Sequence, residues 1–174
     1  MDTFDAILGK RDTRRFSDRD IDADTLQRLL QAARMAGSAR DAQPVRLVVL
    51  RDRALREELA ACGNSTAHVV NCPVAVVFVL VPELGVVGAP FTIFRGPFDS
   101  GRAAQNLMLA AWAEGISSCP ASMHNGEAAA KVLDLPEGHI VANVIALGYP
   151  DGVETGRATR PRLPLDDYVH WERW

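Results

Sequence analysis

Apolar residues recur along the chain with two different spacings, and each spacing predicts one type of element. Spacings of three and four positions predict helices over residues 3–9, 53–61, 99–113 and 126–133, and a further helix that begins after Asp22 or Asp24 and ends near Gly37. Apolar runs predict strands over residues 46–50, 73–81 and 140–147, and a strand or extended turn over 116–122. The run over 73–81 is apolar without interruption, which is typical of a strand covered on both faces.

Strands that alternate with helices predict an α/β or α+β sheet flanked by helices. The helix over 99–113 has almost no charge after Arg102, so we expect it to be largely buried. Residues 85–97 are rich in Gly and Pro and predict a loop. The tail from Thr159 to Trp174 predicts an extended arm. Its apolar side chains need a surface to cover, which a partner subunit would supply: Leu163, Leu165, Tyr168, Val169, Trp171 and Trp174.

Length and composition narrow the class of protein. The 174 residues are 48% hydrophobic, which suits one globular domain over residues 1–174. The formal net charge of −3 argues against a nucleic-acid or membrane-surface partner. No signal pattern opens the chain, and the longest apolar run is too short to span a bilayer, so we expect a soluble cytoplasmic protein. Cys62, Cys72, Cys119 and the histidines lack metal-ligand or redox spacing, and we expect free thiols and no metal site.

Three polar clusters are candidates for chemistry. In the first, four cations fall within six residues: Lys10, Arg11, Arg14 and Arg15, with Asp12 among them. Such a cluster either binds an anion such as phosphate or forms a solvated surface turn. The second cluster, Gly37–Pro44, offers hydroxyl, carboxylate and amide groups between a helix and a strand, and is either a ligand loop or an ordinary connection.

The third cluster is Arg160-Pro161-Arg162. Pro161 favours an extended backbone, in which alternate residues point the same way, so two guanidinium groups would face one anion. The alternative is a basic tail. Nucleophile-elbow and Walker sequences are absent, and no Gly-x-Gly-x-x-Gly follows a strand, which argues against a Rossmann dinucleotide site.

Taken together, these segments resemble the nitroreductase superfamily of flavoproteins. Lys10–Phe16 is similar to the motif Arg-Arg-Ser-x-Arg-x-Phe, and Gly37–Val45 is similar to Pro-Ser-x-x-Asn-x-Gln-Pro-Trp. Phe98–Ala111 with Gly115-Ile116 resembles the family's long central helix, and Arg160–Trp174 resembles a common family ending. Each motif is weak by itself, but four of them follow in register over almost the whole chain.

The resemblance implies an α+β three-layer sandwich in which helices flank a mostly antiparallel central sheet. It also implies a homodimer joined through the long helices, with the C-terminal arm on the partner and two FMN sites at the interface. The implied activity is NAD(P)H-dependent, ping-pong hydride transfer through flavin N5 to nitroaromatics, quinones or similar small-molecule acceptors. Because the cofactor performs the redox chemistry, no general acid, base or nucleophile is assigned.

By the same resemblance, cofactor-binding roles fall on residues spread along the chain. Lys10, Arg11, Asp12 and Arg14 would lie at the phosphate, ribityl chain and pyrimidine edge, with Arg160 and Arg162 completing the phosphate site. The other subunit would contribute Ser38, Ala39, Asp41 and Gln43. Backbone groups of Pro120, Ala121 and Ser122 would lie beside flavin N5, and His68 would contact the isoalloxazine or be a plain surface histidine.

Some positions depart from the family pattern. Gly37, Asp41 and Val45 replace the usual Pro, Asn and Trp. Asp41 would repel a reduced flavin unless Arg40 or Arg46 neutralises it. The segment that forms a substrate lid in relatives is reduced to about residues 85–97, which implies an open and permissive site.

Two alternative functions therefore stay open. Asp12, in place of Ser, and Ser122 are similar to residues of flavin-fragmenting relatives that make 5,6-dimethylbenzimidazole. Asp41 and the short lid segment instead suggest a flavin-binding or storage protein without turnover.

Overall fold

The computed structural model describes residues 1–82, 89–152 and 161–174. Its centre is a four-stranded sheet in the order β1-β2-β4-β3, in which every neighbouring pair is antiparallel. The strands are β1 (Val45–Leu50), β2 (Val74–Leu80), β3 (Ser117–Ala121) and β4 (Ile140–Gly148). The edge strands of the sheet are therefore β1 and β3.

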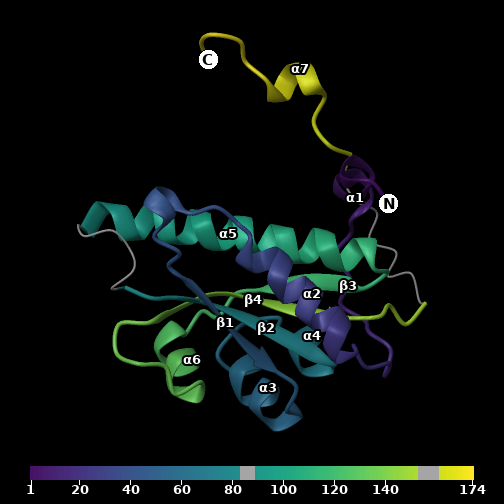
Figure 1. Ribbon diagram of the computed structural model, residues 1–174, viewed down its shortest axis with the longest axis vertical. Helices are drawn as coiled ribbons and strands as arrows, with labels where there is room; N and C mark the ends of the chain where they lie inside the picture. The colour runs from purple at the N-terminus through teal and green to yellow at the C-terminus, as the bar shows by residue number, and fades with distance from the viewer. Residues whose placement is uncertain (83–88, 153–160) are drawn as a thin grey trace.

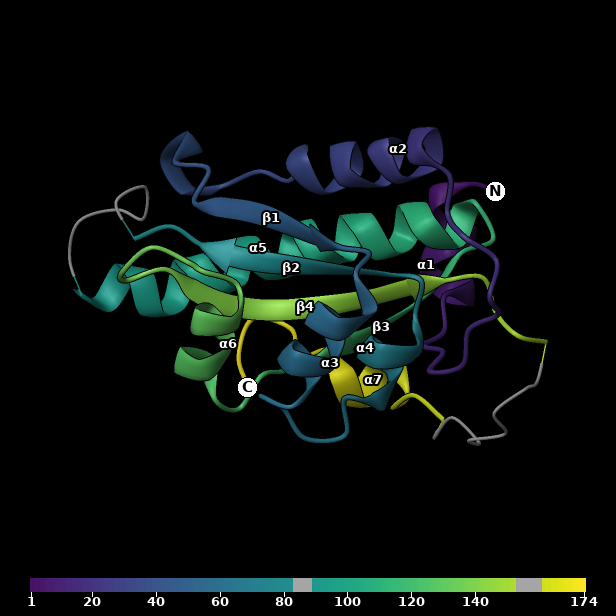
Figure 2. The ribbon, with the colours of Figure 1, turned by 90° about the horizontal axis from the view of Figure 1, so that it is seen from below.

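Helices cover both faces of the sheet, as Figures 1 and 2 show from two directions. One face carries α2 (Ala23–Arg34) and the long α5 (Ala89–Ala113), and α1 (Thr3–Gly9) packs against α5. The opposite face carries α3 (Arg53–Ala60), α4 (Ala67–Asn71) and α6 (Gly126–Val132). The fold is a three-layer α+β sandwich, as the resemblance implies.

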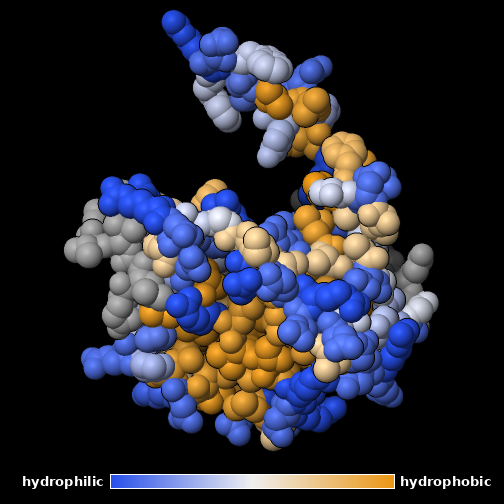
Figure 3. Space-filling view, in the orientation of Figure 1, coloured by the Kyte–Doolittle hydropathy of each residue, from blue (hydrophilic) through white to orange (hydrophobic). Residues whose placement is uncertain are grey.

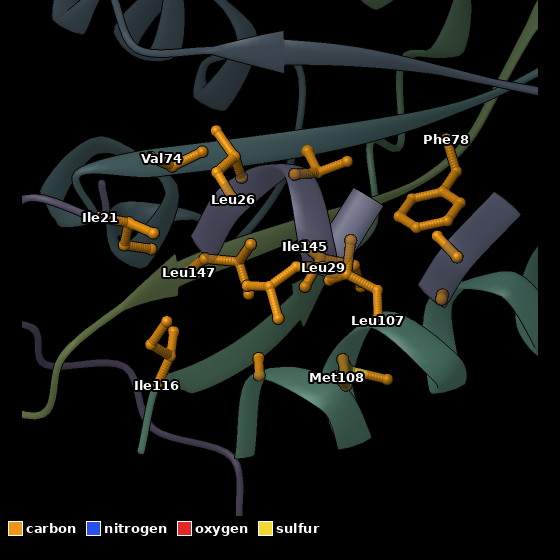
Figure 4. Close-up of a cluster of buried hydrophobic side chains, with 14 of the residues drawn as sticks. Ile21, Leu26, Leu29, Val74, Phe78, Leu107, Met108, Ile116, Ile145 and Leu147 are labelled. Atoms are coloured by element: carbon orange, nitrogen blue, oxygen red, sulfur yellow. The ribbon is translucent and has the colours of Figure 1, made fainter. Parts of the chain in front are cut away.

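Strand β2 explains how two cores form on one sheet. All seven of its residues are buried. Val74, Val76 and Phe78 face α2 and α5 in the cluster of Figure 4. Ala75 and Val77 face the helices of the other layer. Because side chains alternate across a strand, a continuously apolar run is what a strand between two helix layers requires.

Aspartates set the beginnings of the helices. The carboxylate of Asp22 accepts a hydrogen bond from the backbone N–H of Thr25 at 2.8 Å, so Asp22 rather than Asp24 caps α2. Asp2 and Asp52 cap α1 and α3 in the same way. These bonds satisfy backbone donors that the first turn of a helix leaves unpaired.

The predicted loop over 85–97 is wrong from Ala89 onward, where α5 begins, and residues 83–88 lie outside the described residues. Pro97 lies inside this helix. Gly96, just before it, has no Cβ and lies against the side chain of Leu80, so packing on the sheet overrides the local preference of Gly and Pro for a turn.

Other differences are smaller. The helix predicted to end near Gly37 ends at Arg34, and α5 is only partly buried, because Arg102, Gln105 and Asn106 are exposed. The arm was predicted to be extended, but it contains a helical turn, α7 (Leu165–Tyr168). The sequence did not predict α4 or the 3-10 turn η1 (Ala39–Asp41). Within the described part of the chain, no helix combines the length and apolar character needed to cross a bilayer.

Candidate functional site

The first basic cluster runs along the outer edge of β3, on the side away from β4. Asp12 forms an isolated parallel bridge with Ser118, and the backbone N–H of Thr13 donates to the Ser118 carbonyl at 3.1 Å. Farther along the chain, Phe16 bridges Pro150 and the N–H of Ser17 donates to the Tyr149 carbonyl at 2.9 Å. These contacts fix the backbone that carries the cations against the sheet.

The cations of this cluster have different partners. Lys10 pairs with Asp12 and also contacts the sulfur of Met108 on α5. Arg15 pairs with Asp151 at 2.8 Å. Arg11 donates to two carbonyl oxygens, those of Leu8 and Lys10, at 2.7 and 2.9 Å.

Arg14 lies beside the thiol of Cys119 and is exposed. Within residues 1–82, 89–152 and 161–174, neither Arg11 nor Arg14 has a carboxylate partner. The charges of these two guanidinium groups are thus not neutralised by a carboxylate among the described residues, which favours an anion beside β3.

His68 reaches the same strand from the other layer. Its Nε2 atom lies 3.2 Å from the Pro120 carbonyl oxygen, and the residue is 4% exposed. Because a carbonyl only accepts, Nε2 carries the proton in this bond. Burial lowers the pKa of His68 and the nearby Arg14 lowers it further, while the Pro120 carbonyl and Asp12 oppose the shift. His68 is therefore a neutral, buried side chain at this site and not a surface histidine.

The residues predicted to lie by flavin N5 differ in exposure. Pro120 and Ser122 are exposed, and Ala121 is buried. A Cβ on Gly63 would come within 2.7 Å of the Ser122 carbonyl oxygen, so Gly63 allows the chain before α4 to approach β3 closely.

Two residues of this site were missed from the sequence. Ser118 is 1% exposed, and its hydroxyl has no hydrogen-bond partner among the described residues. Cys119 is buried next to Arg14; burial raises the pKa of its thiol, which the guanidinium partly offsets. Only the pairing of Asp12 with Ser118 identifies these residues, and a pairing between distant segments leaves no local signal.

The second cluster forms a loop over residues 38–43, between α2 and β1. The Ser38 hydroxyl accepts from the Gln43 backbone N–H at 2.8 Å, and the Gln43 side-chain amide donates to Asp41 at 3.0 Å. The Asp41 carboxylate is thus hydrogen-bonded by an amide. In the described part of the chain, neither Arg40 nor Arg46 forms an ion pair with it. Arg46 instead donates to the Gln43 carbonyl at 2.8 Å.

Within one chain the two clusters lie at different points along α5. The 38–43 loop contacts α5 at Asp99, through the Ala39 backbone N–H, whereas Lys10 contacts Met108. Asp99 and Met108 are nine positions apart on the helix, which corresponds to about 13.5 Å along its axis. Figure 1 accordingly places η1 and α1 toward opposite ends of α5. One chain therefore carries two separated groups of candidate residues.

Two hollows border the 38–43 loop. One, of about 600 Å³, lies between the end of α2 and the exposed side of α5, and its lining includes Gly37, Phe98 and Arg102. The other, of about 500 Å³, lies between α2 and β1 and has an apolar floor with Leu30 and Leu47 in its lining. Figure 3 shows a broad hydrophobic area over this part of the sheet.

The third cluster begins the arm. Arg160 lies outside the described residues, and Arg162 is exposed. The arm extends away from the three layers in Figure 1, and its large apolar side chains are uncovered: Leu163, Leu165, Tyr168, Trp171 and Trp174.

The remaining thiols and histidines do not assemble with acidic groups. Cys62, Cys72 and Cys119 are free, and burial raises the pKa of Cys72 to about 11. Across the described ranges, no three His, Cys, Asp or Glu side chains are close enough to hold a metal ion.

The Nitroreductase family model matches residues 7–149 of this chain. An Archaeoglobus fulgidus protein with the provisional name NADH dehydrogenase/NAD(P)H nitroreductase is 30% identical over 172 residues, which are 97% of this chain and 96% of that protein.

Two solved structures share the fold closely. The NADPH:FMN oxidoreductase from Vibrio harveyi, solved in complex with NAD+, has a TM-score of 0.86 at 28% identity, and the match covers 99% of this chain and 77% of that one. Nitroreductase A from Vibrio parahaemolyticus has a TM-score of 0.89 at 29% identity, covering 100% of this chain and 77% of that one. Likeness in sequence and in fold thus extends over nearly the whole chain.

Proposed function

Because the chain belongs to the nitroreductase family and is an oxidoreductase of that family, we propose that it works as a homodimeric, FMN-dependent NAD(P)H oxidoreductase. Its acceptors are nitroaromatics, quinones or similar small molecules, reduced in a ping-pong cycle. The observation that carries this proposal is the basic segment along the outer edge of β3. In it, Arg11 and Arg14 have no carboxylate partner among the described residues. FMN, when bound, supplies the transfer of hydride between NAD(P)H and the acceptor.

The side chains at this edge fit the phosphate of FMN. A phosphate carries two negative charges and accepts several hydrogen bonds, which favours guanidinium and ammonium donors. Lys10, Arg11 and Arg14 supply such donors, and the backbone of this segment is fixed to β3 at Ser118. Arg160 and Arg162 would add two more cations from the arm.

The edge position of β3 provides backbone groups for the ring of the cofactor. Groups that point away from β4 on an edge strand have no sheet partner. The Pro120 carbonyl accepts a hydrogen bond from His68, which orients this end of the strand. The backbone groups near Ala121 and Ser122 are therefore those that we propose to lie by flavin N5, and no side chain here is proposed as a general acid or base.

The separation of the two clusters along α5 is the physical reason to propose a dimer. Two copies of α5 packed antiparallel would bring the 38–43 loop of one subunit to the basic segment of the other. Ser38, Ala39, Asp41 and Gln43 would then complete a site that one chain leaves open. The uncovered arm would gain its missing surface on the same partner.

The test is the absorption spectrum and turnover of the purified protein. We expect a yellow protein after FMN titration, which oxidises NADH or NADPH only when a nitroaromatic or a quinone is present as acceptor. Protein that stays colourless at saturating FMN would contradict the cofactor assignment. Bound FMN without nicotinamide oxidation would instead favour a storage role.

Arg14→Ala tests the phosphate contact directly. Loss of one charge-assisted hydrogen bond is worth about 1.5–3 kcal/mol, so we expect FMN to bind roughly 10- to 100-fold more weakly in a fluorescence titration. Arg53→Ala is the matched control, because Arg53 is an exposed arginine paired with Glu57 on α3, away from β3. Equal FMN affinity in Arg14→Ala and in the control would refute the phosphate assignment.

A further inference from the structure

The 38–43 loop has a backbone that its residues do not favour. Three of its six residues have positive φ angles without being glycine: Arg40 at 56°, Asp41 at 53° and Gln43 at 48°. In this left-handed region the Cβ atom crowds the backbone, so such residues occur in isolation and rarely three within four positions. Outside contacts must therefore hold the loop in this shape.

Contacts within the loop are exposed and local. The Ser38 hydroxyl and the Asp41 carboxylate bond to Gln43, and these groups all belong to the loop itself. Such bonds are made as easily to water, so they do not anchor the loop to the rest of the molecule.

From outside the loop, the exposed Arg46 on β1 donates to the Gln43 carbonyl at 2.8 Å, and Asp99 supplies a buried anchor. It lies on α5, is 4% exposed, and its Oδ2 atom accepts from the Ala39 backbone N–H at 3.2 Å. Its Oδ1 atom lies 3.7 Å from Nη1 of the exposed Arg102. The Arg102 guanidinium in turn lies against Gly37, where a Cβ would come within 2.6 Å of it. A buried carboxylate is costly unless it is hydrogen-bonded, and here the loop backbone is the donor and the Arg102 guanidinium lies close enough to offset the charge.

The residue after Asp99 contacts the sheet and not the loop. This residue, Ser100, is fully buried, and its hydroxyl accepts from the Asn143 side-chain amide at 2.9 Å. Asn143 lies on β4 where the pairing with β2 shifts register. Neighbouring residues of α5 thus reach in two directions, Ser100 to the sheet and Asp99 to the loop.

We propose that Asp99 is a positioning residue, which holds the 38–43 loop in its left-handed conformation and so presents Ser38, Asp41 and Gln43 in one arrangement to the FMN of the partner subunit. The part of this statement that concerns FMN rests on the proposed function. The anchoring of the loop by Asp99 depends only on contacts within one chain.

Hydrogen exchange of the flavin-free protein tests the loop directly. In Asp99→Ala the amide of Ala39 loses a charge-assisted hydrogen bond, so we expect it to exchange roughly tenfold faster, together with its neighbours in the loop. Ser100→Ala is the matched control, because it removes a buried polar contact at the adjacent residue that does not touch the loop. Asp99→Asn keeps an acceptor oxygen and should restore wild-type exchange to within about threefold.

FMN titration of the same variants tests the consequence. We expect FMN to bind roughly tenfold more weakly to Asp99→Ala, and as tightly as to the wild type in Ser100→Ala and Asp99→Asn. Where Asp99→Ala does not fold, Asp99→Ser carries the same expectation, because its hydroxyl is too short to reach Ala39.

The two proposals fail in different ways. Wild-type exchange at Ala39 in Asp99→Ala, or an equal increase in Ser100→Ala, would overturn the anchoring role whatever the cofactor. FMN affinity that does not change in a variant with a loosened loop would overturn the presentation of the loop to FMN and leave the proposed function standing. A wild-type protein that binds no FMN would overturn the proposed function, while the exchange result would still decide the role of Asp99.

Discussion

His68 illustrates at the residue scale how tertiary contacts change a side chain. Sequence alone left it as either a flavin contact or a surface histidine. The side chain is buried on α4 and donates to Pro120 of β3, so the surface interpretation is wrong and the flavin contact stays a prediction. Its Nδ1 atom is buried and has no hydrogen-bond partner among the described residues. This environment favours the neutral imidazole.

The lowered pKa of His68 makes stability depend on pH. The folded protein binds a proton at His68 less readily than the unfolded chain, whose imidazole titrates near 6.5. The stability from this residue is therefore present above pH 6.5 and is lost as the pH falls through the lower folded pKa, by at most about 1.4 kcal/mol per pH unit. Thermal unfolding between pH 5 and 8 should show a shallower loss in His68→Gln, which keeps an N–H donor for Pro120.

His170→Gln is the control for this pH series, since His170 is exposed in the arm. It should follow the wild-type curve. Identical pH dependence in His68→Gln and the wild type would show that burial of His68 does not govern the acid side of the stability curve.

The basic residues of the candidate site were identifiable from the sequence, whereas their neighbours in space were not. Lys10, Arg11 and Arg14 stand out because several cations within a few residues are costly without an anion. Ser118 and Asp99 give no such signal. Each is a single small or acidic residue in an ordinary strand or helix, and only a contact with residues 106 or 60 positions away gives it a role.

At the scale of elements, hydrophobic spacing predicted the strands to within about two residues and found α5 from Asp99 onward. The sequence missed the part of α5 from Ala89 to Pro97. Gly and Pro favour turns locally, and this preference takes no account of the surface on which the residues pack. The contact of Gly96 with Leu80 supplies that surface. The sequence likewise missed η1, whose left-handed residues depend on the Asp99 anchor.

Gly148 marks a close approach between elements. A Cβ at this end of β4 would lie 2.7 Å from Cδ of Pro73 and 2.9 Å from Cδ1 of Phe16. Since Phe16 follows the basic segment, Gly148→Ala should displace that segment and destabilise the fold by about 1–3 kcal/mol, the usual cost of overpacking. Chemical denaturation measures this loss.

Gly126→Ala is the matched glycine variant, because a Cβ there meets nothing within 4 Å. It should change the free energy of unfolding by less than about 0.5 kcal/mol. If both variants have the wild-type free energy of unfolding, the backbone at Phe16 can shift at little cost and is not held by close packing on β4.

At the scale of the whole molecule, large apolar side chains are exposed on α5, on the arm and on α1. Phe98 on α5 is 65% exposed, and Trp171 and Trp174 of the arm are almost fully exposed. Phe4 and Leu8 of α1 add to this surface. Exposed apolar area on this scale is typical of an interaction face.

Phe98→Glu tests the dimer. A carboxylate buried at a helix–helix interface without a partner is costly, so we expect a shift from dimer to monomer in sedimentation velocity, together with much weaker FMN binding. Ile140→Glu is the control, because Ile140 is also exposed, at 57%, but belongs to β4 of the sheet and not to α5. A monomeric Phe98→Glu protein that binds FMN as tightly as the wild type would contradict a site shared between subunits.

The sequence by itself determined which residues are apolar and with what period, and hence the layers, the strands covered on both faces and the basic segment. These are local properties, because hydrophobic period and charge clusters depend only on residues that are close in the sequence. Only the tertiary structure decided that Ser118 lies beside Asp12, that Asp99 holds a strained loop, and that the two clusters lie apart along α5. Contacts between distant segments depend on how the layers pack, and no neighbouring residue encodes them.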